Sequence, residues 1–178
     1  MALSAPIDRE PLHARKIILE GFRRSDGLFD IEAELTDTKM YKFSVGDRGQ
    51  IDPGQPLHRM RIRLTIDQGL AIVGAEAETV DAPFSVCPGG AETFGRLIGL
   101  HIRAGFLKEA SARIGGIAGC THIRELLQQI ATVAIQTTYV LPQRQRSDAD
   151  AAKRMIDSCF AYAADGPVVR RRWPHLAR

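Results

Sequence analysis

The sequence predicts an α+β fold, in which an antiparallel sheet of about four strands is covered on one face by helices that follow it in the chain. In the first half, apolar and polar residues alternate with a period of two, which is typical of strands with one dry face and one wet face. From residue 91 onward apolar residues recur every three or four positions, as in helices packed on a core. Strands followed by helices indicate the α+β class.

The first hairpin is expected from residues 16–24 and 28–37, joined by the turn Ser25-Asp26-Gly27. Asp-Gly is a strong hairpin signal because glycine tolerates the positive φ of such turns. The second strand has an apolar face and an acidic face: Phe29, Ile31, Ala33 and Leu35 against Asp30, Glu32 and Glu34.

The second hairpin follows residues 46–56, which we interpret as a loop. Its first strand alternates clearly, with Met60, Ile62, Leu64 and Ile66 on one face and Arg59, Arg61, Arg63 and Thr65 on the other. His58 has the phase of Met60, so its side chain is expected on the dry face. The turn 67–69 leads into residues 71–80, whose Glu76 and Glu78 are expected to pair with the arginines.

Three helices are predicted after a loop, residues 83–90, that carries Cys87. The first has Phe94, Leu97 and Ile98 on its apolar side, and the second, residues 106–114, ends at two glycines. The third begins after Gly119 with Thr121 as its expected N-cap and runs to about Tyr139, with an apolar stripe of Ile123, Leu126, Leu127, Ile130 and Ala134.

Residues 15–141 are therefore expected to form a single domain. A polar linker, a short helix over 155–162 and a basic tail follow, and we expect residues 142–178 to pack on the same domain.

Composition excludes several classes of protein. A chain of 178 residues with 44% hydrophobic and 25% charged residues is typical of one globular domain. It has no apolar run of the roughly 18 residues that a membrane helix needs and no apolar leader at its start, so we expect a cytoplasmic protein without a membrane partner. A net charge of +3 with 6% aromatic residues argues against nucleic-acid binding. Three cysteines without a CxxC pair argue against a disulfide framework.

The candidate functional groups are His58, Cys87, Cys120 and His122. Nucleotide-binding glycine motifs, HExxH and GxSxG are absent, which argues against nucleotide-dependent and serine-hydrolase chemistry. A thiol at a helix N-terminus, as expected for Cys120, favours the thiolate because of the helix dipole. Two histidines and two cysteines would also suit zinc or iron as metal ligands, although each is equally explained as a buried core residue.

A second group of candidates lies in the first hairpin: Arg23, Arg24, Asp26 and Asp30. They are explained either as surface ion pairs or as an arginine fork that anchors a phenolate or carboxylate beside a proton-handling carboxylate. Glu125 follows His122 by three residues on the same helix face and is placed to orient it.

The segments GFRRSDGLFDIEAEL, LHRMRIRLTID, GCTHIRELL and SCFAYAADGPVV resemble a bacterial family of domains of unknown function, DUF2889, over about residues 15–175. The resemblance implies a link to bacterial breakdown of plant-derived aromatic compounds.

The order of elements also resembles the NifU-type iron–sulfur scaffold fold (NifU/SufE-like), which implies that His58, Cys87, Cys120 and His122 lie at or near ligand positions. The chain departs from that pattern, since His58 replaces a cysteine, Met60 replaces an aspartate, and Cys120-Thr121-His122 replaces a His-Cys order.

Three functions follow from these residues. The first is a cofactor-independent lyase that acts by general acid–base catalysis on a small aromatic, plant- or lignin-derived substrate. Its expected catalytic residues are His58, His122, Asp30, Arg24 and Cys120, and its expected substrate-binding residues are Arg23, Cys87, Met60 and Glu125. The second is a metal- or iron–sulfur-binding module, and the third is a non-catalytic ligand-binding protein. We expect no cofactor in the first case and zinc or iron in the second, with a small-molecule substrate and a homodimer as the partners to test.

Overall fold

The computed structural model describes residues 3–139, 152 and 155–178, and these form two compact units, one up to Thr138 and one from Tyr139 to Arg178. The strands are β1 (His13–Arg23), β2 (Phe29–Lys39), β3 (Phe43–Val45), β4 (Gly49–Ile51), β5 (Pro56–Ile66) and β6 (Ile72–Asp81). The α-helices are α1 (Gly89–Glu92), α2 (Phe106–Ile114), α3 (Thr121–Tyr139) and α5 (Pro167–Arg172). Short 3-10 turns occupy Gly46–Arg48, Thr93–Leu97, Gly116–Ala118, Phe160–Tyr162 and Pro174–Leu176.

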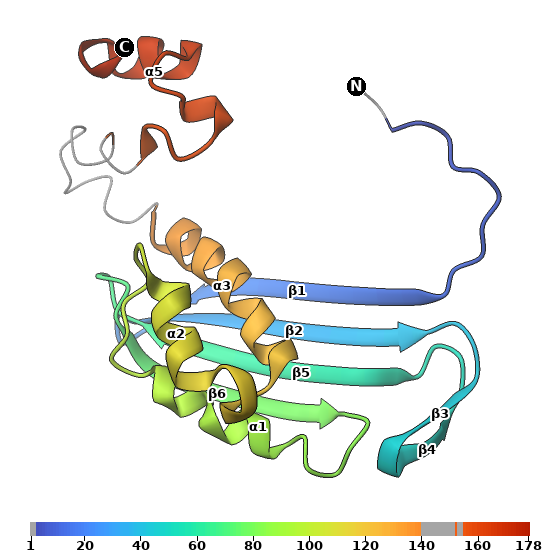
Figure 1. The fold of residues 1–178 in the computed structure, drawn as a ribbon. Helices are drawn as coiled ribbons and strands as arrows, with labels where there is room; N and C mark the ends of the chain where they lie inside the picture. The colour runs from blue at the N-terminus through green and yellow to red at the C-terminus, as the bar shows by residue number, and fades with distance from the viewer. Residues whose placement is uncertain (1–2, 140–151, 153–154) are drawn as a thin grey trace. The chain divides into compact units, whose positions relative to one another are not determined.

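The first unit is built on a four-stranded antiparallel sheet in the order β1-β2-β5-β6. Helices α1, α2 and α3 lie on one face of this sheet (Figure 1). The predicted α+β class and the position of the helices on one face are therefore confirmed. Two tight turns account for the neighbours β1-β2 and β5-β6, because a tight turn places a strand beside the one that precedes it. Residues 40–55 join β2 to β5, which also pair antiparallel.

The core lies between the dry face of the sheet and the helices. Alternate residues of β2 and β5 are buried, as their period of two predicts, and they meet the apolar stripe predicted for α3. Each large apolar side chain buried in this way stabilises the fold by about 1.5–3 kcal/mol relative to an exposed one.

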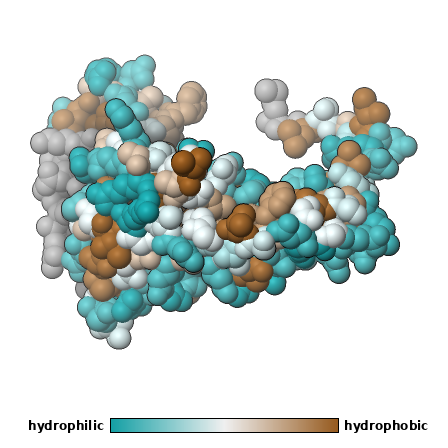
Figure 2. Space-filling model, turned by 60° about the horizontal axis from the view of Figure 1, so that its bottom comes forward, coloured by the Kyte–Doolittle hydropathy of each residue, from teal (hydrophilic) through white to brown (hydrophobic). Residues whose placement is uncertain are grey.

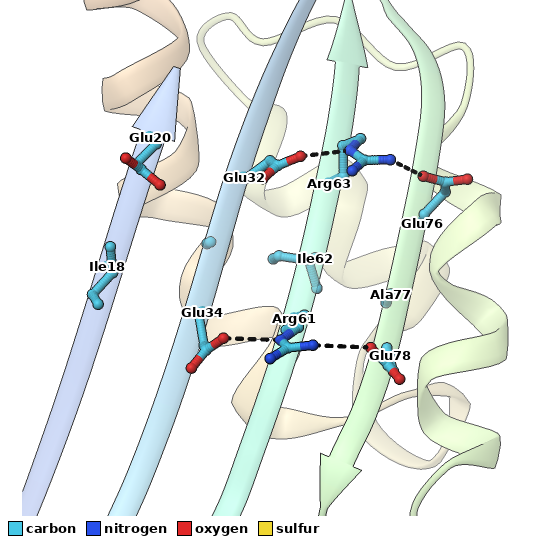
Figure 3. A pocket seen from close by; sticks show the side chains of 11 residues that line it. Ile18, Glu20, Glu32, Glu34, Arg61, Ile62, Arg63, Glu76, Ala77 and Glu78 are labelled. Atoms are coloured by element: carbon cyan, nitrogen blue, oxygen red, sulfur yellow. Dashed lines mark hydrogen bonds and ion pairs between the residues drawn. The ribbon is translucent and has the colours of Figure 1, made fainter. Parts of the chain in front are cut away.

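The opposite face of the sheet carries two rows of ion pairs (Figure 3). Arg63 lies 2.8 Å from Glu32 and 3.1 Å from Glu76. Arg61 lies 2.9 Å from Glu34 and 4.0 Å from Glu78. The predicted pairing across the sheet is confirmed. On the side of the molecule shown in Figure 2, apolar residues stand singly or in small groups among polar ones, which is normal for a protein surface.

Three predicted elements differ in the structure. The predicted loop 46–56 contains β4, which pairs with β3 and buries Ile51, and β5 already begins at Pro56. The predicted first helix is a single turn, α1, followed by the 3-10 turn Thr93–Leu97. Three glycines at positions 89, 90 and 95 disfavour a longer α-helix there because glycine loses more backbone entropy than other residues.

The predicted short helix over 155–162 is also wrong. Asp157 has a φ of 59°, which no α-helix tolerates, and only Phe160–Tyr162 forms a 3-10 turn. In the predicted tail, α5 forms instead, and Val169 and Trp173 are buried with Ala152 in a small core of the second unit. The predicted linker falls largely on residues outside the described ones, and the packing of 142–178 on the first domain stays a prediction. No helix among the described residues is long and apolar enough to cross a membrane.

Candidate functional site

The candidate site is a cluster of Asp37, His58 and His122 on the dry face of the sheet. Asp37 has the phase of Leu35 in β2, and its side chain is 2% exposed. His58 lies directly opposite Asp37 in the register of β2 and β5, so its predicted orientation toward the dry face is confirmed. His122 is the second residue of α3, and the helix brings its ring above the two strands.

The three side chains are in close contact. Asp37 Oδ2 lies 3.3 Å from His58 Nδ1 and 3.9 Å from His122 Nε2. The two imidazole rings stack with their centroids 3.9 Å apart and their planes at 33°. A single carboxylate oxygen therefore faces one nitrogen of each ring.

The carboxylate of Asp37 is held from the other side by β1. Arg15 donates from Nε to Oδ1 at 2.7 Å and from Nη2 to Oδ2 at 2.8 Å, which is a bidentate pair. Arg15 also donates from Nη1 to Glu125 Oε2 at 2.7 Å, and His13 Nε2 lies 3.4 Å from Asp37 Oδ1. A buried charge is tolerated only with such partners, so Arg15 is what allows an ionised Asp37 under the helices.

The protonation states follow from these contacts. Burial raises the pKa of Asp37, but the hydrogen bonds and charge of Arg15, with His13 and His58, outweigh burial and lower that pKa overall. Burial lowers the pKa of His58, and the neighbouring His122 lowers it further against the opposing pull of Asp37. Burial likewise lowers the pKa of His122. At neutral pH the site is thus one carboxylate and two neutral imidazoles with lone pairs free to accept protons.

Cys120 connects this cluster to a surface hollow. Its Sγ lies 3.8 Å from His122 Nδ1, so Cys120 is close to His122 as expected, and it lines a hollow of about 470 Å³ together with Cys87. The other lining residues are Val86, Gly89, Gly90, Thr93, Arg96, Ile117, Ala118 and Gly119.

Helix α3 begins at Thr121, and the Arg124 amide donates a hydrogen bond to the Cys120 carbonyl at 3.0 Å. Cys120, rather than the predicted Thr121, therefore occupies the N-cap position.

The predicted metal ligands are only partly brought together. Among the described residues, the group with donor atoms close enough to share an ion is Asp37, His58 and His122, whose donors lie within 4.8 Å of one another. Cys87 and Cys120 are not in it, and a carboxylate takes their place. His58 Nδ1 is buried without a hydrogen bond of good geometry, so its position suits a further ligand. Two histidines and a carboxylate are a donor set that zinc and iron both accept.

The hairpin residues do not converge on this cluster, so the expectation of one shared site was wrong. Arg24 pairs with Asp26 at 2.7 Å and with Asp30 at 3.4 Å, and Asp30 accepts a hydrogen bond from Thr65 at 2.7 Å. Asp30 and Asp37 are seven residues apart on β2, about 23 Å along the strand. Because seven is odd, they also lie on opposite faces of the sheet.

The remaining predicted site residues lie in the core, on the surface or beside Arg15. Met60 is 1% exposed within the core, and Arg23 is an exposed residue at the end of β1. Glu125 contacts Arg15 instead of His122, so it supports the site through the arginine. Sequence reasoning missed Asp37, Arg15 and His13. The signal for Asp37 was present, because an acidic residue continues the apolar phase of β2 directly after Leu35.

Comparison with known proteins gives one match. The family model described as "Protein of unknown function (DUF2889)" matches residues 13–136, which include His13, Arg15, Asp37, His58 and His122. Neither the curated proteins nor the solved structures contain a match, so the resemblance to NifU-type scaffolds stays a prediction. Because the family model covers more than half of the 178 residues, this chain belongs to the DUF2889 family.

Proposed function

We propose that Asp37, His58 and His122 form the acid–base site of a lyase that acts on a small aromatic substrate without a bound cofactor. The observation that carries this proposal is a pair of imidazole rings, stacked on each other and with lowered pKa values, beside one ionised, buried carboxylate. Side chains in this arrangement move protons at neutral pH, and clusters with shifted pKa values are typical of catalytic sites.

An elimination needs a base that removes one proton and a donor that stabilises the departing oxygen. The negative charge of Asp37, 3.3 Å from His58 Nδ1, favours the tautomer of His58 that carries the proton on Nδ1, and this leaves Nε2 as the base. His122 supplies the second proton-transfer group. Arg15 keeps Asp37 ionised, which stabilises whichever imidazole becomes protonated during the reaction.

The hollow beside Cys120 is the proposed substrate site. Val86 and Ile117 offer exposed apolar surface for a ring, and Arg96 offers a cation for a phenolate or carboxylate oxygen. Arg96 therefore replaces Arg24 in the proposed role of binding the substrate's anionic oxygen. Arg24 lies in the turn before β2, at the opposite end of that strand from Asp37. The aromatic class of substrate is carried over from the expectation stated for the sequence, since the family itself is described only as one of unknown function.

The test is turnover of a panel of lignin-derived aromatic alcohols and ethers by chelator-dialysed protein, with products identified by mass spectrometry. His58→Gln and His122→Gln are expected to lower the rate about 10²–10⁴-fold each, as loss of an acid–base group does. His101→Gln is the matched control, because His101 is exposed and outside the cluster. Full turnover by the variant that carries both His58→Gln and His122→Gln would contradict the proposal.

A second candidate function is binding of a divalent transition metal by the same three donors. The observation that favours it is the 4.8 Å grouping of Asp37, His58 and His122 with the unsatisfied His58 Nδ1. Elemental analysis of protein purified without a metal-affinity tag tests it directly. About one zinc or iron per chain, lost in Asp37→Asn, would favour this function over cofactor-independent catalysis.

A further inference from the structure

Strand β1 is a long sheet edge, and none of the described residues pairs with its outer side. It runs for 11 residues, none of them buried, and its pairing with β2 continues without a bulge from His13 to Arg23. Natural edge strands are usually protected by shortness, proline, bulges or inward-pointing charges, and an exposed regular edge is a template for pairing. Strand β1 contains no proline, and its outward row of backbone N–H and C=O groups is free among the described residues.

On the dry face of β1, Arg15 is paired with Asp37 and Glu125, whereas the two charges on its other face are arranged symmetrically about Ile18. On the face that carries the ion-pair rows, Lys16, Ile18 and Glu20 follow one another at every second position, and all three are exposed. Figure 3 shows Ile18 and Glu20 on β1 beside the rows that Arg61 and Arg63 complete with other glutamates. Among the described residues neither Lys16 nor Glu20 makes an ion pair.

Within one chain, Glu20 faces a like charge. The register of β1 and β2 places Glu20 directly opposite Glu32, an arrangement that is unfavourable in a sheet. A cation supplied from outside the strand would relieve it.

We infer that two copies of this chain pair edge to edge through β1, antiparallel about a two-fold axis at Ile18. In this register Lys16 of each copy lies opposite Glu20 of the partner subunit, and the two Ile18 side chains meet on the axis. On the dry face, the half-buried Ile17 lies opposite Leu19 of the partner subunit, which extends the core across the junction. The two four-stranded sheets become one continuous sheet of eight strands.

The other edge of the sheet does not fit a second copy in this way. The charges of β6 on the same face are Glu76 and Glu78, so two β6 strands would bring like charges together. Its pairing with β5 has two register shifts, and residues 99–100 bond to Ile72 at its start. Self-pairing is therefore assigned to β1 alone of the two edges.

The test is a charge exchange, read by light scattering after size-exclusion chromatography and by sedimentation equilibrium of the full chain. The unaltered chain is expected at twice the 19.6 kDa of one chain. Lys16→Glu and Glu20→Lys each turn two attractive contacts per dimer into repulsive ones, which should weaken association about tenfold or more. The variant with both changes restores opposite charges and should restore the dimer.

Lys108→Glu and Glu92→Lys are the matched controls, because both residues are exposed and lie on helices away from β1. They should leave the dimer intact. A monomeric unaltered chain, a dimer insensitive to both single exchanges, or a double variant that stays monomeric while its circular dichroism shows a folded chain would each overturn the inference.

Discussion

Arg15 donates a hydrogen bond to each carboxylate oxygen of Asp37 on the neighbouring strand, at 2.7 and 2.8 Å. The pair lies directly opposite in the register of β1 and β2, so the sheet itself aligns the two side chains. Asp37 in turn faces both histidine rings, and the protonation state of the cluster therefore depends on one ion pair between two strands.

Replacing Asp37 by Asn is expected to destabilise the fold by about 1.5–3 kcal/mol, because Arg15, whose side chain is 34% exposed, loses its bidentate partner and keeps only Glu125. Urea unfolding followed by circular dichroism measures this. Asp52→Asn is the matched control. Asp52 is 57% exposed and, in the part of the chain that the structure describes, its side chain pairs only with Lys42, so the cost should stay within about 1 kcal/mol. Equal costs for the two variants would show that Asp37 is not the charge that holds the site.

The stability of the protein is expected to fall as the pH is lowered from about 7.5 to 5.5. The pKa values of His58 and His122 are lowered in the folded state, so below their ordinary pKa near 6.5 the unfolded chain binds protons that the folded chain does not. The lowered pKa of Asp37 acts only at more acidic pH and does not contribute in this window.

The measurement is the free energy of unfolding in urea at pH 7.5, 6.5 and 5.5. The variant with His58→Gln and His122→Gln should show a shallower loss than the unaltered chain, whereas His101→Gln should keep the full loss. A slope that the double variant leaves unchanged would mean that the two rings titrate normally.

Replacing Gly21 by Ala is expected to loosen the packing of α3 on β1. A Cβ at this position would meet the side chain of Thr137 on α3 far inside van der Waals distance, so the helix or the strand must move. The cost should be about 1–3 kcal/mol by thermal or urea unfolding. Thr137→Ala in the same chain should recover part of it, and Gly95→Ala, where a Cβ meets nothing, is the control.

The ion-pair rows on the open face are expected to contribute little. Arg63→Met removes both contacts of one row, and because these residues are largely exposed, the change in unfolding free energy should stay within about 1 kcal/mol and shrink further in 0.5 M salt. Thermal unfolding at low and high salt measures this. A large loss of unfolding free energy that salt does not reduce would show that the ion-pair rows contribute substantially to the stability of the sheet.

The alternation of residues 28–37 and 59–66 was enough to predict two strands, their dry faces and the orientation of His58, because side-chain direction in a strand depends only on local period. The apolar stripe of α3 was predicted for the same local reason. The glycine-rich segment after Pro88 was not, since its few turns depend on contacts with the rest of the chain.

The sequence by itself therefore determined the α+β class, the faces of the strands and the presence of His58, His122 and Cys120 near the ends of elements. Only the tertiary structure decided which of these act together. The register of three strands brings Arg15, Asp37 and His58 into one row, and α3 adds His122, while the odd separation along β2 sends Asp30 to the other face and the other end. Such pairings join residues far apart in the chain, so strand register and helix packing determine them and local sequence does not.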